Sequence, residues 1–180
     1  MPKLVTVQRQ ELEVEKAQEY VKTHILFPSG LLGLICVISS AAALVYQFLT
    51  ETYGFLAFEE TTGLLAAGAL LGWGQTRYHR YLLQEFPGYY AARMRAFERK
   101  GPKKSRRDVA VTQLDHRGRS LVPYAYVLGT GLLLGLSALS IMSGHVDRVA
   151  AVMMPWAGFF WAKLFFWRRV LGKVEGPSRK

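Results

Sequence analysis

Two long stretches without a charged residue constrain this chain more than any other feature. No Asp, Glu, Lys or Arg occurs from Thr23 to Thr50 or from Ser120 to Val146, stretches of 28 and 27 residues. An α-helix rises about 1.5 Å per residue, so about 20 apolar residues cross the ~30 Å hydrocarbon core of a bilayer. Buried helices of soluble proteins are rarely uncharged over such lengths. The two stretches therefore predict two transmembrane helices.

Two shorter apolar segments each follow one of these stretches after a short turn. Sixteen uncharged residues separate Glu60 from Arg77, and the segment 149–167 is interrupted only by Pro155 and Lys163. Because the chain must cross back over the membrane, each segment predicts a return helix. We therefore expect an all-α integral membrane protein with four transmembrane helices arranged as two hairpins. The expected spans are 25–48, 56–76, 121–143 and 149–167.

The lysine and arginine residues predict the orientation of these helices. Of the 23 basic residues, all but Arg148 belong to the N-terminal tail, to the segment 77–120 or to the C-terminal stretch from Lys163 onward. Lysine and arginine are retained on the cytoplasmic side, so both termini and the central loop are expected there, in a bacterial inner membrane or its equivalent. This topology explains much of the net charge of +10. With no RNA-binding motif present, we expect no nucleic-acid partner.

These boundaries divide the chain into five expected parts. They are a cytoplasmic tail 1–23, a transmembrane hairpin 24–76, a basic loop 77–120, a second hairpin 121–168 and a cytoplasmic tail 169–180.

The basic loop is the most distinctive part of the sequence. Pro87-Gly88 interrupts the second helix, and the following YYAARMRAFERK predicts a helix with Tyr90, Met94 and Phe97 on one face. Two interpretations remain open: an element that binds anionic lipids or a partner, or a solvated loop that carries only the topology signal. The candidate contact residues are Arg93, Arg95, Arg99, Lys100, Lys103, Lys104, Arg106 and Arg107.

Small residues within the spans predict close helix packing. Gly68 and Gly72 form one GxxxG pair, and Gly131 and Gly135 form another. Lipid tails are as apolar as leucine, so helices in a membrane associate largely through close contact over such small faces. Packing within the chain and packing against another chain are both open.

Histidines and carboxylates offer two weaker candidate sites. His24 and His79 lie at the cytoplasmic ends of neighbouring spans, where they could meet at a haem or quinone. On the opposite face, Glu59, His145 and Asp147 are candidate metal ligands, although none of them shows the helical i, i+4 ligand spacing. The single cysteine, Cys36, excludes an intrachain disulfide. No cofactor is favoured.

Catalytic motifs are missing from the sequence, since it contains no nucleophile elbow, phosphate-binding glycine loop or HExxH pair. We therefore expect a non-catalytic multi-pass membrane protein, acting as an accessory, scaffold or assembly subunit of a larger complex. Its expected partners are membrane lipids, including anionic lipids, and other membrane-protein subunits. The alternatives are a cofactor-binding redox subunit that holds haem, quinone or metal, and a small oligomeric transporter.

Overall fold

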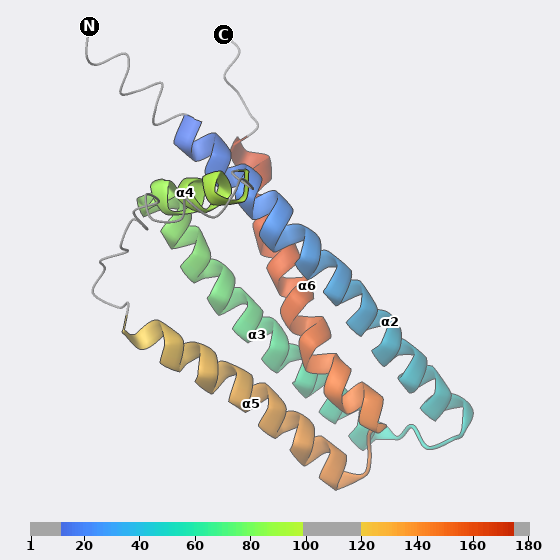
Figure 1. Cartoon of the computed structure of the whole chain (residues 1–180). Helices are drawn as coiled ribbons and strands as arrows, with labels where there is room; N and C mark the ends of the chain where they lie inside the picture. Colours follow the sequence, from blue (N-terminus) through green and yellow to red (C-terminus); the bar gives the residue numbers. More distant parts are fainter. Residues whose placement is uncertain (1–11, 99–119, 175–180) are drawn as a thin grey trace, which may run out of the picture.

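The computed structural model describes residues 12–98 and 120–174, and every regular element within them is a helix (Figure 1). In chain order the elements are η1 (Val21–Leu26), α2 (Phe27–Leu49), α3 (Phe55–Glu85), α4 (Pro87–Glu98), α5 (Leu121–Ser143) and α6 (Arg148–Val174). Residues 12–20 are also helical and lead through η1 into α2. Residues 99–119 of the predicted basic loop lie outside the described residues.

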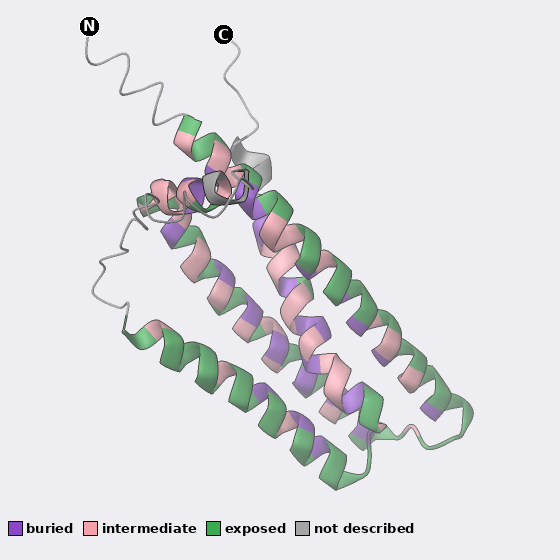
Figure 2. Cartoon of the chain, in the orientation of Figure 1, coloured by how far each residue is buried: buried purple, intermediate pink, exposed green. Residues whose placement is uncertain are grey.

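Four of these helices are long and apolar enough to cross a membrane. They are Leu12–Leu49, Phe55–Glu85, Leu121–Ser143 and Arg148–Trp167. Between 22% and 33% of the residues in their most apolar windows are buried inside the protein, so most of the apolar side chains face outward (Figure 2). This exposure is what a lipid-solvated bundle requires, and it confirms the prediction of an all-α chain with four helices able to span a membrane.

The helices are arranged around a central pair. α3 and α6 make the most extensive pairing in the described part of the chain, and α2 packs along α6 on one side. α5 lies at the opposite edge of the bundle and makes fewer contacts, with α6 and α3 (Figure 1). Its buried residues are limited to Leu133, Ser137 and Ser140. α5 is therefore the most exposed of the four long helices.

Glycines explain the close approach of α3 and α6. A Cβ on Gly68 would collide with the backbone carbonyl of Pro155, and one on Gly72 would collide with that of Phe159. Gly158 of α6 faces the backbone of Leu65 in the same way. Because the glycines carry no side chain, the two backbones touch directly, which increases van der Waals contact along the pair. The first GxxxG pair thus lies at an interface within this chain.

The second GxxxG pair lies in a different environment. A Cβ on Gly131 or Gly135 would meet no atom within 4 Å among the described residues. These two glycines are four residues apart and share one face of α5. No described residue of the bundle covers that face at these two positions.

A π-helical turn precedes α2 and has a local cause. Pro28 stands at the start of α2, where its ring would clash with the carbonyl of residue 24 in a regular α-helix. The helix instead widens to a π-helical turn just before Pro28. In that turn the backbone N–H of Phe27 donates to the carbonyl of Lys22, five residues back. Short π-helical turns of this kind are found frequently at functional sites. Here the turn contains His24.

α4 closes one end of the bundle. It begins at Pro87, directly after α3 ends, and its Tyr90 is only 1% exposed. Tyr90 forms a buried cluster with Ala17, Tyr20 and Leu82, and Met94 packs against that cluster. The face predicted to contact lipid or a partner is therefore occupied, at Tyr90 and Met94, by the chain itself. The side chain of Phe97 lies outside the described residues.

Candidate functional site

A hydrogen-bonded group of three side chains lies where α3, α4 and α5 meet. His79 of α3 is bonded through Nδ1 to the hydroxyl of Tyr90 over 2.8 Å and through Nε2 to the hydroxyl of Tyr126 over 2.9 Å. A neutral imidazole carries one N–H, so one tyrosine accepts a proton from His79 and the other donates to it. Tyr126 is also hydrogen-bonded to Gln75 of α3. The group therefore fixes the ring of His79 from both sides.

Burial determines the protonation state of Tyr90. Loss of solvent around this side chain raises the pKa of its phenol far above the usual range. Tyr90 therefore remains protonated and retains a hydroxyl that can donate one hydrogen bond and accept another.

His24 reaches the same region from the π-helical turn. Its ring stacks on Tyr20, with centroids 4.9 Å apart and planes 8° from parallel, and Tyr20 in turn lies 5.8 Å from Tyr90. His24 and His79 both line one cavity of about 480 Å³. The structure thus brings the two predicted histidines to one site, although hydrogen bonds to tyrosines already occupy both ring nitrogens of His79.

This cavity, which we call the basic cavity, is lined by two cationic side chains and by no acid among the described residues. Its other lining residues are Tyr20, Ile25, Pro28, Ser29, Leu32, Tyr78, Leu82, Tyr89, Tyr90, Arg93, Val122, Tyr126, Phe160 and Lys163. The ammonium of Lys163 lies 5.5 Å from the ring centre of Phe159, and the guanidinium of Arg93 lies 4.7 Å from that of Tyr89. Aromatic faces attract cations at such distances. Both cations are therefore held beside the cavity without an acidic side chain in its lining.

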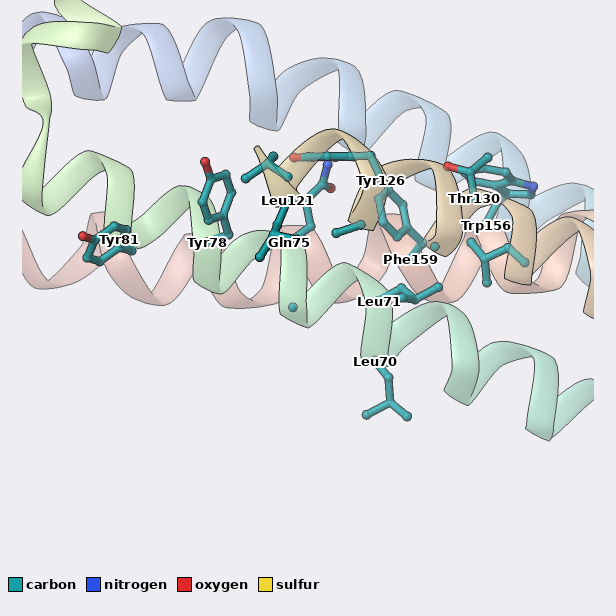
Figure 3. Close-up of a pocket in the computed structure, with 15 residues that line it drawn as sticks. Leu70, Leu71, Gln75, Tyr78, Tyr81, Leu121, Tyr126, Thr130, Trp156 and Phe159 are labelled. Carbon is teal, nitrogen blue, oxygen red and sulfur yellow. The ribbon is translucent and has the colours of Figure 1, made fainter. Parts of the chain in front are cut away.

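An adjoining cavity of about 530 Å³ runs between α3, α5 and α6 (Figure 3). This apolar cavity has no charged residue in its lining, and it is bordered by Leu70, Leu71, Trp156 and Phe159. Its polar lining includes Gln75, whose Oε1 is buried and has no hydrogen-bond partner among the described residues. The two cavities share Tyr78, Val122 and Tyr126 as lining residues. Tyr126 therefore borders both the basic and the apolar cavity.

At the opposite end of the bundle, Glu60 rather than Glu59 makes the contacts. Its Oε2 accepts hydrogen bonds from Ser140 and Ser143 over 2.9 and 2.8 Å, and its Oε1 lies 2.9 Å from Nδ1 of His145. These contacts join the start of α3 to the end of α5. Glu60 therefore acts as a structural link between the two helices.

The predicted metal ligands Glu59, His145 and Asp147 are not assembled. Glu59 is exposed, and Asp147 accepts a hydrogen bond from the backbone N–H of Val149 over 2.8 Å, which caps the start of α6. Residues 12–98 and 120–174 contain no group of three or more His, Cys, Asp or Glu side chains placed to hold a metal ion. The reason is that adjacent helical residues point about 100° apart, and it is Glu60 that faces α5.

Only part of the predicted basic contact surface is described. Arg93 is exposed in α4, and Arg95 belongs to α4 although its side chain lies outside the described residues. Arg99, Lys100, Lys103, Lys104, Arg106 and Arg107 all lie outside the described residues.

Sequence reasoning missed several residues of the site, above all Tyr90, Tyr126, Gln75 and Lys163. Lys163 could have been found from the sequence, since it is the one basic residue within a predicted span. Tyr126 carried none, because tyrosine near a span end is the ordinary composition of a membrane interface.

Comparisons with protein-family models, curated proteins and solved structures find no match for this chain. The site geometry is therefore the basis for assigning a function.

Proposed function

We propose that this protein is a non-catalytic membrane subunit that joins a larger complex through α5. The observation that supports the proposal is the uncovered face of Gly131 and Gly135, around which a Cβ would meet nothing within 4 Å in the described part of the chain. By contrast, Gly68 and Gly72 of α3 and Gly158 of α6 lie against the backbone of the partner helix, so glycine faces of this kind already serve as helix contacts within the bundle. The partner that fits the face is a transmembrane helix with small residues of its own.

The proposal includes a membrane orientation. The end of the bundle that carries α4 faces the cytoplasm, and the turns that follow α2 and α5 face the other side, in a bacterial inner membrane or its equivalent. The support is the sequence distribution, in which Arg148 is the only basic residue assigned to the outer turns.

The test is co-purification of the tagged full-length protein from its native membrane in mild detergent, with partners identified by mass. A double variant, Gly131→Leu with Gly135→Leu, fills the uncovered face. Gly63→Leu is the matched control, since Gly63 of α3 also has no atom within 4 Å of a Cβ. We expect the double variant to lose a partner that the control retains. A chain that purifies alone, or a partner retained by both variants, contradicts the proposal.

A second candidate function is supported by the meeting of His24 and His79 at one cavity. This function is the binding of a membrane-soluble cofactor in a redox subunit. A quinone fits the site better than a haem, because an axial bond to His79 would break one of its two hydrogen bonds. An absorption spectrum of the purified protein tests for haem, and chromatography of its organic extract tests for quinone. Absence of both signals excludes this candidate.

A further inference from the structure

The basic and apolar cavities share three lining residues and differ sharply in charge. We propose that together they bind one phospholipid of net negative charge, with its phosphate beside Lys163 and Arg93 and an acyl chain between α3, α5 and α6. This inference goes beyond subunit assembly, because it assigns a ligand to the interior of the bundle.

Charge identifies the headgroup. Lys163 is half-buried, Arg93 lines the same cavity, and none of the described residues that line either cavity is acidic. A partly desolvated cation is costly unless an opposite charge or a set of hydrogen bonds compensates it. The rings of Phe159 and Tyr89 supply part of this compensation. An anion in the cavity would supply the remainder.

Hydrogen-bonding groups identify where the phosphate oxygens would lie. Whichever tyrosine accepts the N–H of His79 still has its own hydroxyl proton, which it can donate to a phosphate oxygen. The ammonium of Lys163 and the guanidinium of Arg93 add charge-assisted donors. The buried Oε1 of Gln75, which has no partner among the described residues, can accept a hydrogen bond from a glycerol hydroxyl of the headgroup.

The apolar cavity identifies the rest of the ligand. It extends from Tyr126 along Leu71, Phe159 and Trp156, a lining suited to a hydrocarbon chain (Figure 3). Its volume and that of the basic cavity, about 530 and 480 Å³, both fall in the range of roughly 300–1,000 Å³ typical of ligand sites. A free phosphate ion would leave the apolar cavity, which is large enough for an acyl chain, without an occupant. A neutral quinone would fill it but would add no negative charge to a cavity whose described lining residues include two cations and no acid.

The experiment measures lipid binding to the detergent-purified full-length protein by native mass spectrometry. The probes are phosphatidylglycerol, phosphatidylcholine with the same acyl chains, and inorganic phosphate as a competitor. The variants are Lys163→Gln, Arg93→Gln and Tyr126→Phe. Lys22→Gln removes one positive charge from an exposed position outside the cavity, and Tyr124→Phe removes a hydroxyl from an exposed position of α5, so these two are matched controls.

We expect phosphatidylglycerol to bind about tenfold more tightly than phosphatidylcholine, and Lys163→Gln and Arg93→Gln each to weaken its binding about five- to tenfold. Tyr126→Phe should weaken binding less, and both controls should match the unaltered chain. Inorganic phosphate should not displace the lipid at equal concentration.

Three results would overturn the proposal. Equal binding of the two lipids would show that the net charge of the headgroup does not determine binding. Full displacement by inorganic phosphate would indicate a site for a free anion. Recovery of a quinone from the purified protein, with unchanged lipid binding in Lys163→Gln, would assign the cavities to a different ligand. Should Lys163→Gln fail to fold, Arg93→Gln decides the outcome, since Arg93 is exposed at the rim of the cavity and its loss leaves the bundle core intact.

Discussion

The imidazole of His79 in α3 and the hydroxyl of Tyr126 in α5 are joined by a hydrogen bond of 2.9 Å. This bond connects the most exposed long helix to the central pair at the α4 end of the bundle. At the other end, Glu60 connects the same two helices through Ser140, Ser143 and His145. α5 is therefore held by polar contacts near both of its ends.

Replacement of Tyr126 by phenylalanine should loosen α5. The change removes one hydroxyl and leaves His79 with one hydrogen bond in place of two, at a cost of about 1 kcal/mol. For a chain of this length we expect the thermal midpoint in detergent to fall by about 2–4 °C. Tyr124→Phe is the control, because Tyr124 is 73% exposed and should tolerate the change. Equal midpoints for the two variants would refute this role of Tyr126.

Replacement of Gly68 by alanine should disrupt the pairing of α3 with α6. The added methyl group would collide with the backbone carbonyl of Pro155, which cannot rotate away as a side chain could. Overpacking of this kind costs about 1–3 kcal/mol, which thermal unfolding in detergent can measure. Gly74→Ala on the same helix meets no atom within 4 Å and should be neutral or slightly stabilising. If Gly68→Ala leaves the stability unchanged, the backbones of α3 and α6 are farther apart than the structure places them.

Replacement of Glu60 by glutamine should weaken the other attachment of α5. The variant keeps the size of the side chain but loses the charge that faces His145 and strengthens the bonds from Ser140 and Ser143. Since the pair is partly exposed, we expect a loss of about 1 kcal/mol in the free energy of unfolding. Glu59→Gln is the control and should change stability by less than about 0.5 kcal/mol. An effect of Glu59→Gln equal to that of Glu60→Gln would refute the assignment.

The proposed orientation predicts opposite labelling of two engineered cysteines. In a Cys36→Ala background, Glu51→Cys should react with a membrane-impermeant maleimide applied from outside, because Glu51 is exposed after α2. Lys22→Cys, at the α4 end, should react only after the membrane is permeabilised. The reverse pattern would place α4 and the basic loop outside the cytoplasm.

Much of the secondary structure could be predicted from the sequence. The expected spans 121–143 and 25–48 differ by at most two residues at either end from α5 and α2. The continuation of α3 to Glu85 and the helix after Pro87 also follow from local signals, since proline disfavours a helical conformation in the residue before it. These features depend on residues close together in the chain, which a linear pattern records.

The candidate site could be predicted only in part, because the packing of distant residues defines it. The sequence indicated that His24 and His79 lie at the same end of neighbouring spans, but nothing in it showed that Tyr90 and Tyr126 would bind both nitrogens of His79. It also selected Glu59 where Glu60 makes the contacts. A rotation of about 100° about the helix axis separates adjacent residues, and only packing fixes that rotation.

By itself, the sequence determined that this is a helical protein with four segments able to cross a membrane, because the absence of charge over about 20 residues is a local property that decides transfer into lipid. The tertiary structure decided which GxxxG pair is covered, which glutamate links α3 to α5, and that Lys163 and Arg93 line one cavity with His24 and His79. These outcomes depend on the rotation and depth of each helix against its neighbours, which arise from contacts between residues far apart in the chain.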